Sequence, residues 1–230
     1  MRRGDRDALL LVAALLALAG RRQTSSARRM AAARVTTPRT RREGSMLTPR
    51  TDTPMAIVAP LPMLVIGAHS YAPEISDPYG YSSHRGRLHA GVDLTYKRKR
   101  KGDLTQYRRP RESSRGGWYF APADLPVVAT EPGRVTSVKR TERGIGVVIA
   151  HTGKGRATWY QHLATADVKV GQLVVAGSQL GTMGADPSGQ EMIHLHFELW
   201  IWDRAAKVWQ KIDPREYLAG APPARVVTLT

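Results

Sequence analysis

Cysteine is absent from this chain of 230 residues. Its absence excludes a disulfide framework and every metal site that is built on thiolates. A metal ion bound here would have to use histidine, aspartate or glutamate as ligands. The helical His-Glu-x-x-His motif, which carries two zinc ligands and a glutamate base, is absent as well.

Long apolar stretches are scarce, and the unbroken run over residues 8–18 has a specific setting. It follows a charged stretch (residues 1–7) and ends in small residues before Gly20. This three-part pattern predicts a secretory signal peptide over residues 1–19, since the run is shorter than the roughly 20 residues of a membrane span. We therefore expect export to the periplasm, the cell envelope or the extracellular space. The alternatives are an uncleaved anchor and a later start codon, at Met46 or Met55.

The net charge of +16 is concentrated in two segments. Residues 1–50 carry a net +9 and residues 95–125 a net +6, so the rest of the chain is close to neutral. We interpret residues 20–55 as a disordered basic linker and residues 95–125 as a basic insert loop. Such segments are attracted to anionic envelope polymers, unless they are merely solvated. We expect no specific nucleic-acid partner, because such binders carry their charge on the folded surface.

Helical periodicity is lacking after the signal, and short β-rich runs alternate with Gly, Pro and Asp instead. This spacing predicts an all-β domain over residues 56–220, an antiparallel β-sandwich or barrel-like fold, with a C-terminal tail at residues 221–230. We expect a monomer. The runs that carry this prediction are residues 126–129, 133–138, 146–150, 157–160 and 172–176.

The segment Ile193-His194-Leu195-His196-Phe197-Glu198-Leu199 alternates strictly between apolar and polar residues. On a strand, the apolar residues face a core, and His194, His196 and Glu198 share the other face. Two imidazoles on one strand face can reach a common site, although an ordinary half-exposed strand has the same pattern.

Two further segments hold candidate site residues. His89 and Asp93 are four positions apart with Gly91 between them, so they could curl around one ion, and zinc accepts both kinds of ligand. His162 lies in Tyr160-Gln161-His162-Leu163, at a predicted strand end. Each segment alone is a weak signal, since a surface histidine is the simpler interpretation.

Together and in this order, the motifs resemble those of the lysostaphin-type (LytM-like) zinc peptidases of the bacterial cell wall. The resemblance covers about residues 64–219, interrupted by the basic insert. It rests on His89 to Asp93, Pro126 to Ala129, Gly133 to Val135, Tyr160 to Leu163, Val168 to Val174, Gly177 to Gly181 and His194 to Glu198.

The resemblance implies a duplicated hybrid motif fold and a role for each site residue. His89, Asp93 and His196 match the family's zinc ligands. His162 and His194 match the two histidines that line the site, and we expect them to orient water and stabilise an oxyanion, with one of the two moving protons. Three protein ligands leave a zinc position open for a water molecule, which is the catalytic arrangement.

The implied function is a secreted zinc metalloendopeptidase that hydrolyses peptide cross-links of peptidoglycan through a zinc-activated water. The alternative is a non-catalytic module of the same fold that binds the wall or activates an amidase. A carrier-type barrel of the biotinyl or lipoyl kind is a third interpretation, but no lysine lies at a suitable turn. We expect His151 to be structural, and Glu198 to be either a support for the site or a strand-edge charge.

Overall fold

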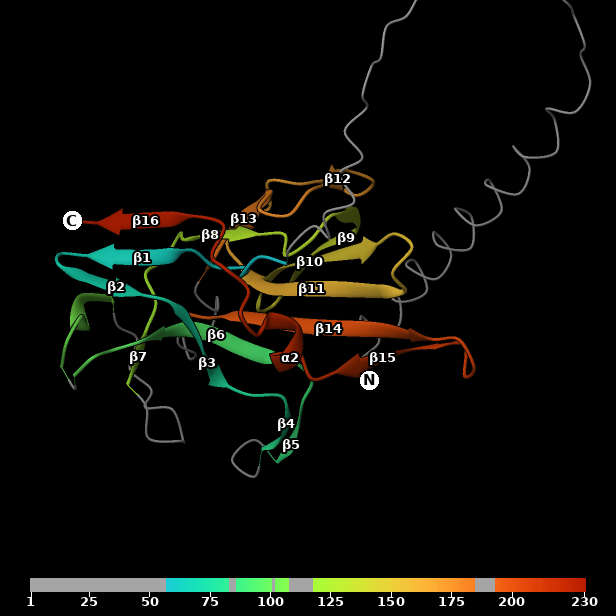
Figure 1. Ribbon diagram of the computed structural model, residues 1–230, viewed down its shortest axis with the longest axis horizontal. Helices are drawn as coiled ribbons and strands as arrows, with labels where there is room; N and C mark the ends of the chain where they lie inside the picture. The colour runs from blue at the N-terminus through green and yellow to red at the C-terminus, as the bar shows by residue number, and fades with distance from the viewer. Residues whose placement is uncertain (1–56, 83–85, 101, 108–117, 185–192) are drawn as a thin grey trace, which may run out of the picture.

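The computed structural model describes residues 57–82, 86–100, 102–107, 118–184 and 193–230 (Figure 1). The predicted signal peptide and the predicted basic linker lie outside these ranges, as do residues 108–117 of the predicted insert. No helix within the described ranges is long and apolar enough to cross a membrane.

A nine-stranded sheet dominates the described part of the chain. Its strands pair in antiparallel fashion, which confirms the prediction of an antiparallel all-β fold. The order is β12 (Leu173–Val174), β9 (Gly133–Thr141), β10 (Gly144–His151), β11 (Arg156–Leu163), β14 (Leu195–Asp203), β6 (Val92–Lys97) and β3 (Pro73–Asp77); β15 (Val208–Ile212) pairs with β14, and β7 (Tyr119–Phe120) pairs with β6.

Three smaller sheets flank this large one in the described ranges. They are β16 (Val226–Leu229), β1 (Met63–Ile66) and β2 (His69–Tyr71); β13 (Gln179–Thr182) and β8 (Pro126–Val128); and the hairpin of β4 (Gly80–Ser82) and β5 (Arg87–His89). The helical segments in the part of the chain that the structure describes are short: the 3-10 helix η1 (Thr105–Tyr107) and α2 (Arg215–Leu218).

Two segments differ from the boundaries that the sequence suggests. The last residues, expected to form a tail, include β16, which pairs in parallel with β1 because its Val-Val-Thr-Leu run favours a strand. The stretch expected as one loop over residues 95–125 starts inside β6 and includes β7. Tyr96 and Phe120 are almost fully buried there, so these parts of the stretch belong to the sheet and the predicted insert loop is left with the residues between Lys97 and Tyr119.

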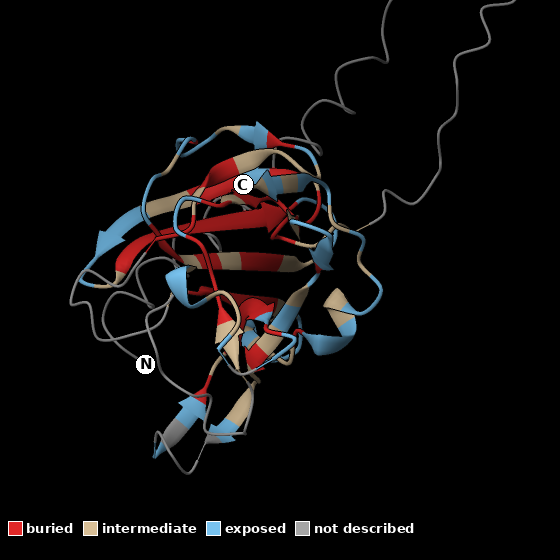
Figure 2. Ribbon diagram, turned by 90° about the vertical axis from the view of Figure 1, so that its left-hand side faces the viewer, coloured by how far each residue is buried: buried red, intermediate tan, exposed pale blue. Residues whose placement is uncertain are grey.

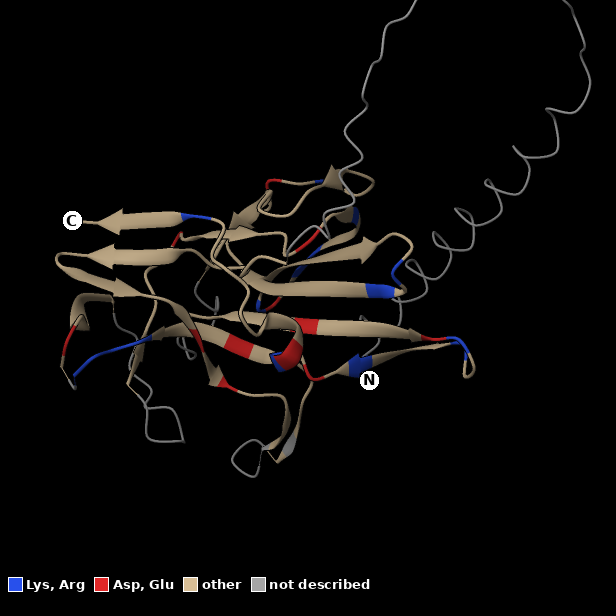
Figure 3. Ribbon diagram, viewed as in Figure 1, with Lys and Arg blue, Asp and Glu red and all other residues tan. Residues whose placement is uncertain are grey.

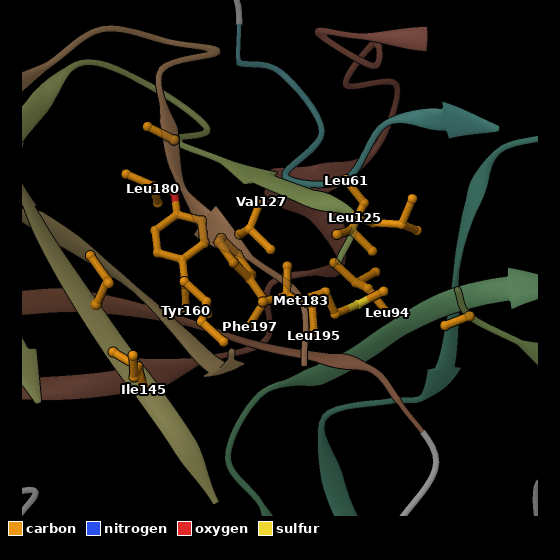
Figure 4. Packing of buried hydrophobic residues seen from close by; sticks show 14 of the residues in the cluster. Leu61, Leu94, Leu125, Val127, Ile145, Tyr160, Leu180, Met183, Leu195 and Phe197 are labelled. Atoms are coloured by element: carbon orange, nitrogen blue, oxygen red, sulfur yellow. The ribbon is translucent and has the colours of Figure 1, made fainter. Parts of the chain in front are cut away.

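The main core lies on one face of the large sheet (Figure 4). Tyr160 of β11 and Phe197 of β14 pack edge to face, with ring centroids 5.3 Å apart. Burying each large apolar side chain contributes about 1.5–3 kcal/mol. Burial is concentrated along the central strands (Figure 2). Since Leu195 and Phe197 are fixed in this core, the intervening residues of β14 must face the other way.

Candidate metal centre

β14 and β6 bring the first two candidate ligands together. His196 alternates with Leu195 and Phe197, so its side chain lies on the face of the sheet opposite the main core. The register pairs His196 directly with Asp93 on β6. Directly paired residues have Cβ atoms about 4.5–5.5 Å apart, which allows both side chains to reach one point. Acidic positions on these two neighbouring strands are visible in Figure 3.

The third candidate ligand, His89, ends β5 immediately before the chain enters β6. Gly91 makes this approach possible, because a Cβ atom there would lie 2.3 Å from the carbonyl oxygen of Phe197 and 3.0 Å from Nε2 of His196. No side chain fits in that space. The glycine between His89 and Asp93 therefore has a steric role: it allows the segment to pack directly on β14.

The ligand atoms of these three residues form a small triangle. Nε2 of His89 lies 3.1 Å from Oδ1 of Asp93 and 3.0 Å from Nδ1 of His196. Nδ1 of His196 lies 2.9 Å from Oδ1 of Asp93. All three residues are buried. They are the group within the described residues that could hold a metal ion.

Hydrogen bonds on the outer side of each imidazole orient its free nitrogen towards this triangle. Nδ1 of His89 lies 2.9 Å from the carbonyl oxygen of Pro78, which only accepts, so Nδ1 carries the proton and Nε2 presents its lone pair. Nε2 of His196 lies 3.1 Å from Oε1 of Glu198, so the same argument leaves Nδ1 of His196 as the potential ligand. Partners of this kind fix the tautomer of metal-binding histidines.

The donor set fits zinc. Two imidazole nitrogens and one carboxylate oxygen are ligands that zinc accepts, at about 2.0–2.2 Å. Tetrahedral ligands at that distance are roughly 3.3 Å apart, so the observed triangle needs only a small expansion. Three converging lone pairs repel one another unless a proton or a cation lies among them. The fit therefore follows from the chemistry of these atoms as well as from their positions.

The electrostatics of the cluster favour a positive charge at its centre. Burial lowers the pKa of His196, but the hydrogen bonds to Asp93 and Glu198 outweigh burial and raise it to about 9. Burial raises the pKa of Asp93, but the charge of His194 and the contacts with the imidazoles of His196 and His89 hold it well below its ordinary value. The carboxylate thus stays ionised beside the two imidazoles, as a cation ligand must.

His162 and His194 line the same cluster. Their ring centroids are 4.7 Å apart, and Nε2 of His194 lies 3.6 Å from Oδ1 of Asp93. Nδ1 of His162 lies 2.8 Å from the carbonyl oxygen of Arg143, so it carries the proton and leaves Nε2 as an acceptor. Burial, followed by the charge of His194, lowers the pKa of His162 to about 3. His162 is therefore neutral at physiological pH.

The backbone at His162 is held in an unusual conformation. Its φ of 67° lies in the left-handed region, which costs a residue other than glycine about 1 kcal/mol or more. Gly144, on the adjacent strand, is what makes room for this bend. A Cβ atom there would lie 2.9 Å from the carbonyl oxygen of Leu163, and its φ of 99° also requires glycine. Local strain of this kind is typical of functional positions.

The structure thus brings together all five residues that the sequence singles out: His89, Asp93, His162, His194 and His196. Two further histidines of the described ranges lie elsewhere. His151 is buried with both ring nitrogens bonded, to the carbonyl oxygen of Pro132 and to Oγ1 of Thr158. His69 is exposed on β2. The carbonyl groups of Pro78 and Arg143 are site components that sequence reasoning misses, because backbone acceptors leave no trace in residue type.

Comparison with known proteins gives a family match for part of the chain. Residues 112–214 match Peptidase family M23. This segment contains His162, His194 and His196 but begins after His89 and Asp93. The fold brings these two candidate ligands to His196 from outside the matched segment, through the pairing of β6 with β14.

The individual proteins that resemble this chain share a modest fraction of its residues. The chain is 35% identical over 95 residues to the cell division protein DipM of Caulobacter vibrioides, which covers 41% of this chain. The match spans 15% of the length of that relative. Among solved structures, the catalytic domain of lysostaphin from Staphylococcus simulans is 22% identical, with a TM-score of 0.43. That match covers 64% of this chain and 92% of the lysostaphin domain. A zinc-containing peptidase from Vibrio cholerae is 24% identical, with a TM-score of 0.44; the match covers 73% of this chain and 41% of that protein.

Proposed function

We propose, from the match of residues 112–214 to Peptidase family M23, that this protein is a secreted zinc metalloendopeptidase that hydrolyses peptide cross-links of peptidoglycan. The observation that carries the proposal is the triangle of ligand atoms from His89, Asp93 and His196, with sides of 2.9–3.1 Å. The outer hydrogen bonds of both imidazoles support it, because they leave the inner nitrogens free to bind a metal.

The three ligands would hold zinc with a fourth position open. Bound zinc supplies Lewis acidity towards a scissile carbonyl and lowers the pKa of water to about 7. The sequence has no His-Glu-x-x-His motif, and so lacks the glutamate base that this motif supplies. Proton handling therefore falls to the remaining histidines of the cluster.

His162 and His194 have distinct parts in this proposal. His162 is neutral, with its Nδ1–H donated to Arg143, so its Nε2 can accept a hydrogen bond from the attacking water and orient it. His194 faces the carboxylate of Asp93 and can donate a hydrogen bond towards negative charge that develops on the substrate. The leaving amine must take up a proton before it departs, and we infer that one of these two imidazoles delivers it.

The experiment is a digestion of purified sacculi that differ in cross-link chemistry, with released fragments identified by mass spectrometry. We expect cleaved cross-links, one zinc per chain, and loss of both cleavage and zinc after chelation or in His196→Ala. His69→Ala is the matched control, since it removes an exposed histidine on β2 and should cleave at the unmodified rate.

The outcomes separate the alternatives. Sacculi that stay intact while zinc remains bound would leave a wall-binding or amidase-activating module in place of an enzyme. Cleavage that survives the loss of zinc would overturn the proposed chemistry itself.

A further inference from the structure

The face of the large sheet that carries His196 and Glu198 continues into a group of tryptophans. Strand alternation places Trp200 and Trp202 on this face of β14. The register sets Trp159 of β11 opposite Glu198, and Trp209 of β15 opposite Trp202. Trp159 and Trp200 have ring centroids 6.0 Å apart, and those of Trp202 and Trp209 are 5.5 Å apart. These four residues form what we call the indole row.

Small residues beneath the row let its rings lie against the sheet. A Cβ atom at Gly146 would lie 2.7 Å from Nε1 of Trp159, so that position admits no side chain. Val148, Ala150 and Ala157 are buried on this outer face and form a second apolar cluster with Trp200, against which Trp159 and Trp209 pack. The row thus packs on one side against small apolar residues of the sheet, while Trp159, Trp202 and Trp209 remain partly exposed.

A polar contact joins the indole row to the metal centre. Nζ of Lys211 lies 4.6 Å from the ring centroid of Trp200 and 5.7 Å from that of Trp159. The same ammonium lies 3.1 Å from Oε2 of Glu198, whose Oε1 accepts the hydrogen bond from His196. The row is therefore continuous with the candidate active site, with Trp200 buried as support.

We propose that the indole row binds the glycan strand of peptidoglycan next to the peptide that is cut. This inference rests on the proposed function, because it takes peptidoglycan as the substrate. An indole offers a flat apolar face with a polar edge, which suits the C–H face of a pyranose ring. Hydroxyl and acetamido groups at the sugar edge would find the amide of Gln161 and the ammonium of Lys211 nearby, both on the same face of the sheet.

The spacing between the metal centre and the row matches the geometry of such a substrate. Trp159 is level with Glu198, two residues along from His196, and Trp200 is four residues along, so they lie about 7–13 Å from it at 3.3 Å per residue. Three or four extended residues of a stem peptide span about 10–14 Å. With the scissile bond at the metal centre, the sugar that bears the stem would fall on this row.

The first test is a titration of the ¹⁵N-labelled full chain with peptide-free glycan strands, followed through the five indole N–H signals. We expect the signals of Trp159, Trp202 and Trp209 to shift. Trp118 is not part of the row; its carbonyl oxygen accepts a hydrogen bond from the backbone N–H of Arg98, and its indole signal should stay in place. Unmoved signals from the row, or an equal shift of Trp118, would overturn the inference.

The second test compares cleavage of intact sacculi with cleavage of a soluble cross-linked peptide that lacks sugar. We expect Trp159→Leu and Trp209→Leu to lower kcat/KM on sacculi about 5- to 10-fold, mainly through KM, without effect on the peptide. Trp118→Leu is the matched control and should change neither. Equal losses on both substrates would contradict glycan binding.

The two proposals fail in different ways. If the unmodified protein cuts neither substrate while glycan strands still shift the indole signals, the peptidase proposal fails and the glycan site stands. If it cuts both substrates while the glycan shifts nothing, the reverse holds.

Discussion

The two ends of β11 each hold a buried polar cluster with histidine and a carboxylate, but their hydrogen bonding differs. At the His162 end, imidazole nitrogens and a carboxylate oxygen face one another across 2.9–3.1 Å. At the Arg156 end, each polar atom has a partner of opposite character. We call these the metal cluster (His89, Asp93, His162, His194 and His196) and the Glu131 cluster (Glu131, His151, Lys154, Arg156 and Tyr217).

The Glu131 cluster is a closed set of complementary contacts. Oε1 of Glu131 accepts hydrogen bonds from Nε of Arg156 at 2.6 Å and from the hydroxyl of Tyr217 at 3.0 Å. Oε2 accepts from Nη2 of Arg156 at 2.7 Å and from Nζ of Lys154 at 2.5 Å. Tyr217 belongs to α2, so the cluster fastens the C-terminal segment to the sheet.

The comparison shows that burial of a histidine says little about its function. His151 and His89 are both buried, and both bond a proline carbonyl through Nδ1. Nε2 of His151 then meets the hydroxyl of Thr158, whereas Nε2 of His89 meets another imidazole and a carboxylate. Satisfied hydrogen bonds indicate structure, and converging lone pairs indicate a site for a cation.

The largest expected difference between the two clusters comes from replacing one buried histidine in each of them by alanine. His89→Ala should abolish stoichiometric zinc binding and lower kcat/KM by about 10³-fold or more, because it removes a ligand. His151→Ala should keep its zinc while losing about 1–3 kcal/mol of stability, since Thr158 and Pro132 lose a buried partner. Metal analysis and urea unfolding of both variants check the pair. Zinc lost from both, or from neither, would erase the distinction between the clusters.

Within the metal cluster, His162→Ala separates chemistry from metal binding. We expect kcat to fall about 10²- to 10³-fold with the zinc content unchanged, because His162 handles water and protons without being a ligand. Steady-state kinetics beside metal analysis measure both quantities. Unaltered turnover in the zinc-loaded variant would remove His162 from the mechanism.

The Glu131 cluster should reveal itself through acid sensitivity. Burial raises the pKa of Glu131, but the hydrogen bond from Arg156 and further contacts outweigh it and lower the pKa to about 2. A depressed carboxyl pKa stabilises the fold above the unfolded-state value of about 4.5, and this stability is lost as the pH falls from there to about 2. We expect a loss of about 2–3 kcal/mol, reduced from the full linkage value because Lys154 and Arg156 are partly exposed.

Urea unfolding of the unmodified chain and Glu131→Gln across pH 6 to 2.5 measures this effect. The unmodified chain should lose stability steeply below about pH 4.5, and the variant, already less stable at pH 6, should follow a flatter curve. Parallel curves would show that Glu131 does not carry the acid sensitivity.

The smallest effect concerns the outer support of a ligand. Glu198→Gln keeps an acceptor for Nε2 of His196 but removes the charge, so we expect zinc affinity to fall about 10-fold. Competition with a chelator of known affinity measures the change. Asp203→Asn, on the same strand but bonded to Gln210, is the matched control and should bind zinc as before. Equal affinities of the two variants would reduce Glu198 to a strand-edge charge.

Much of the metal cluster could be predicted from the sequence, because strand alternation is a local property. The pattern from Ile193 to Leu199 predicts which side chains face the core, and the structure confirms that Leu195 and Phe197 are buried there. The short runs at residues 133–138 and 146–150 likewise become parts of β9 and β10.

Other features depend on pairings between distant segments and could not be predicted. Nothing near Glu131 in the sequence indicates that Arg156 and Tyr217 will reach it. The pairing of β16 with β1 joins the two ends of the described chain, and no short motif encodes it. The indole row did leave a signal, since Trp200 and Trp202 continue the alternation of His196 and Glu198.

The separation of the ligands along the chain has a consequence for folding. His196 is 103 positions from Asp93 and 107 from His89, so the three atoms meet only when a loop of that length has closed. Closing such a loop costs about 4 kcal/mol of chain entropy. An unfolded chain therefore has no preformed site. A metal ion that binds only the native form, present at a free concentration of about 100 times its Kd, raises the free energy of unfolding by about 2.7 kcal/mol. Metal uptake should then be a late step in folding, because it requires that β6 has already paired with β14.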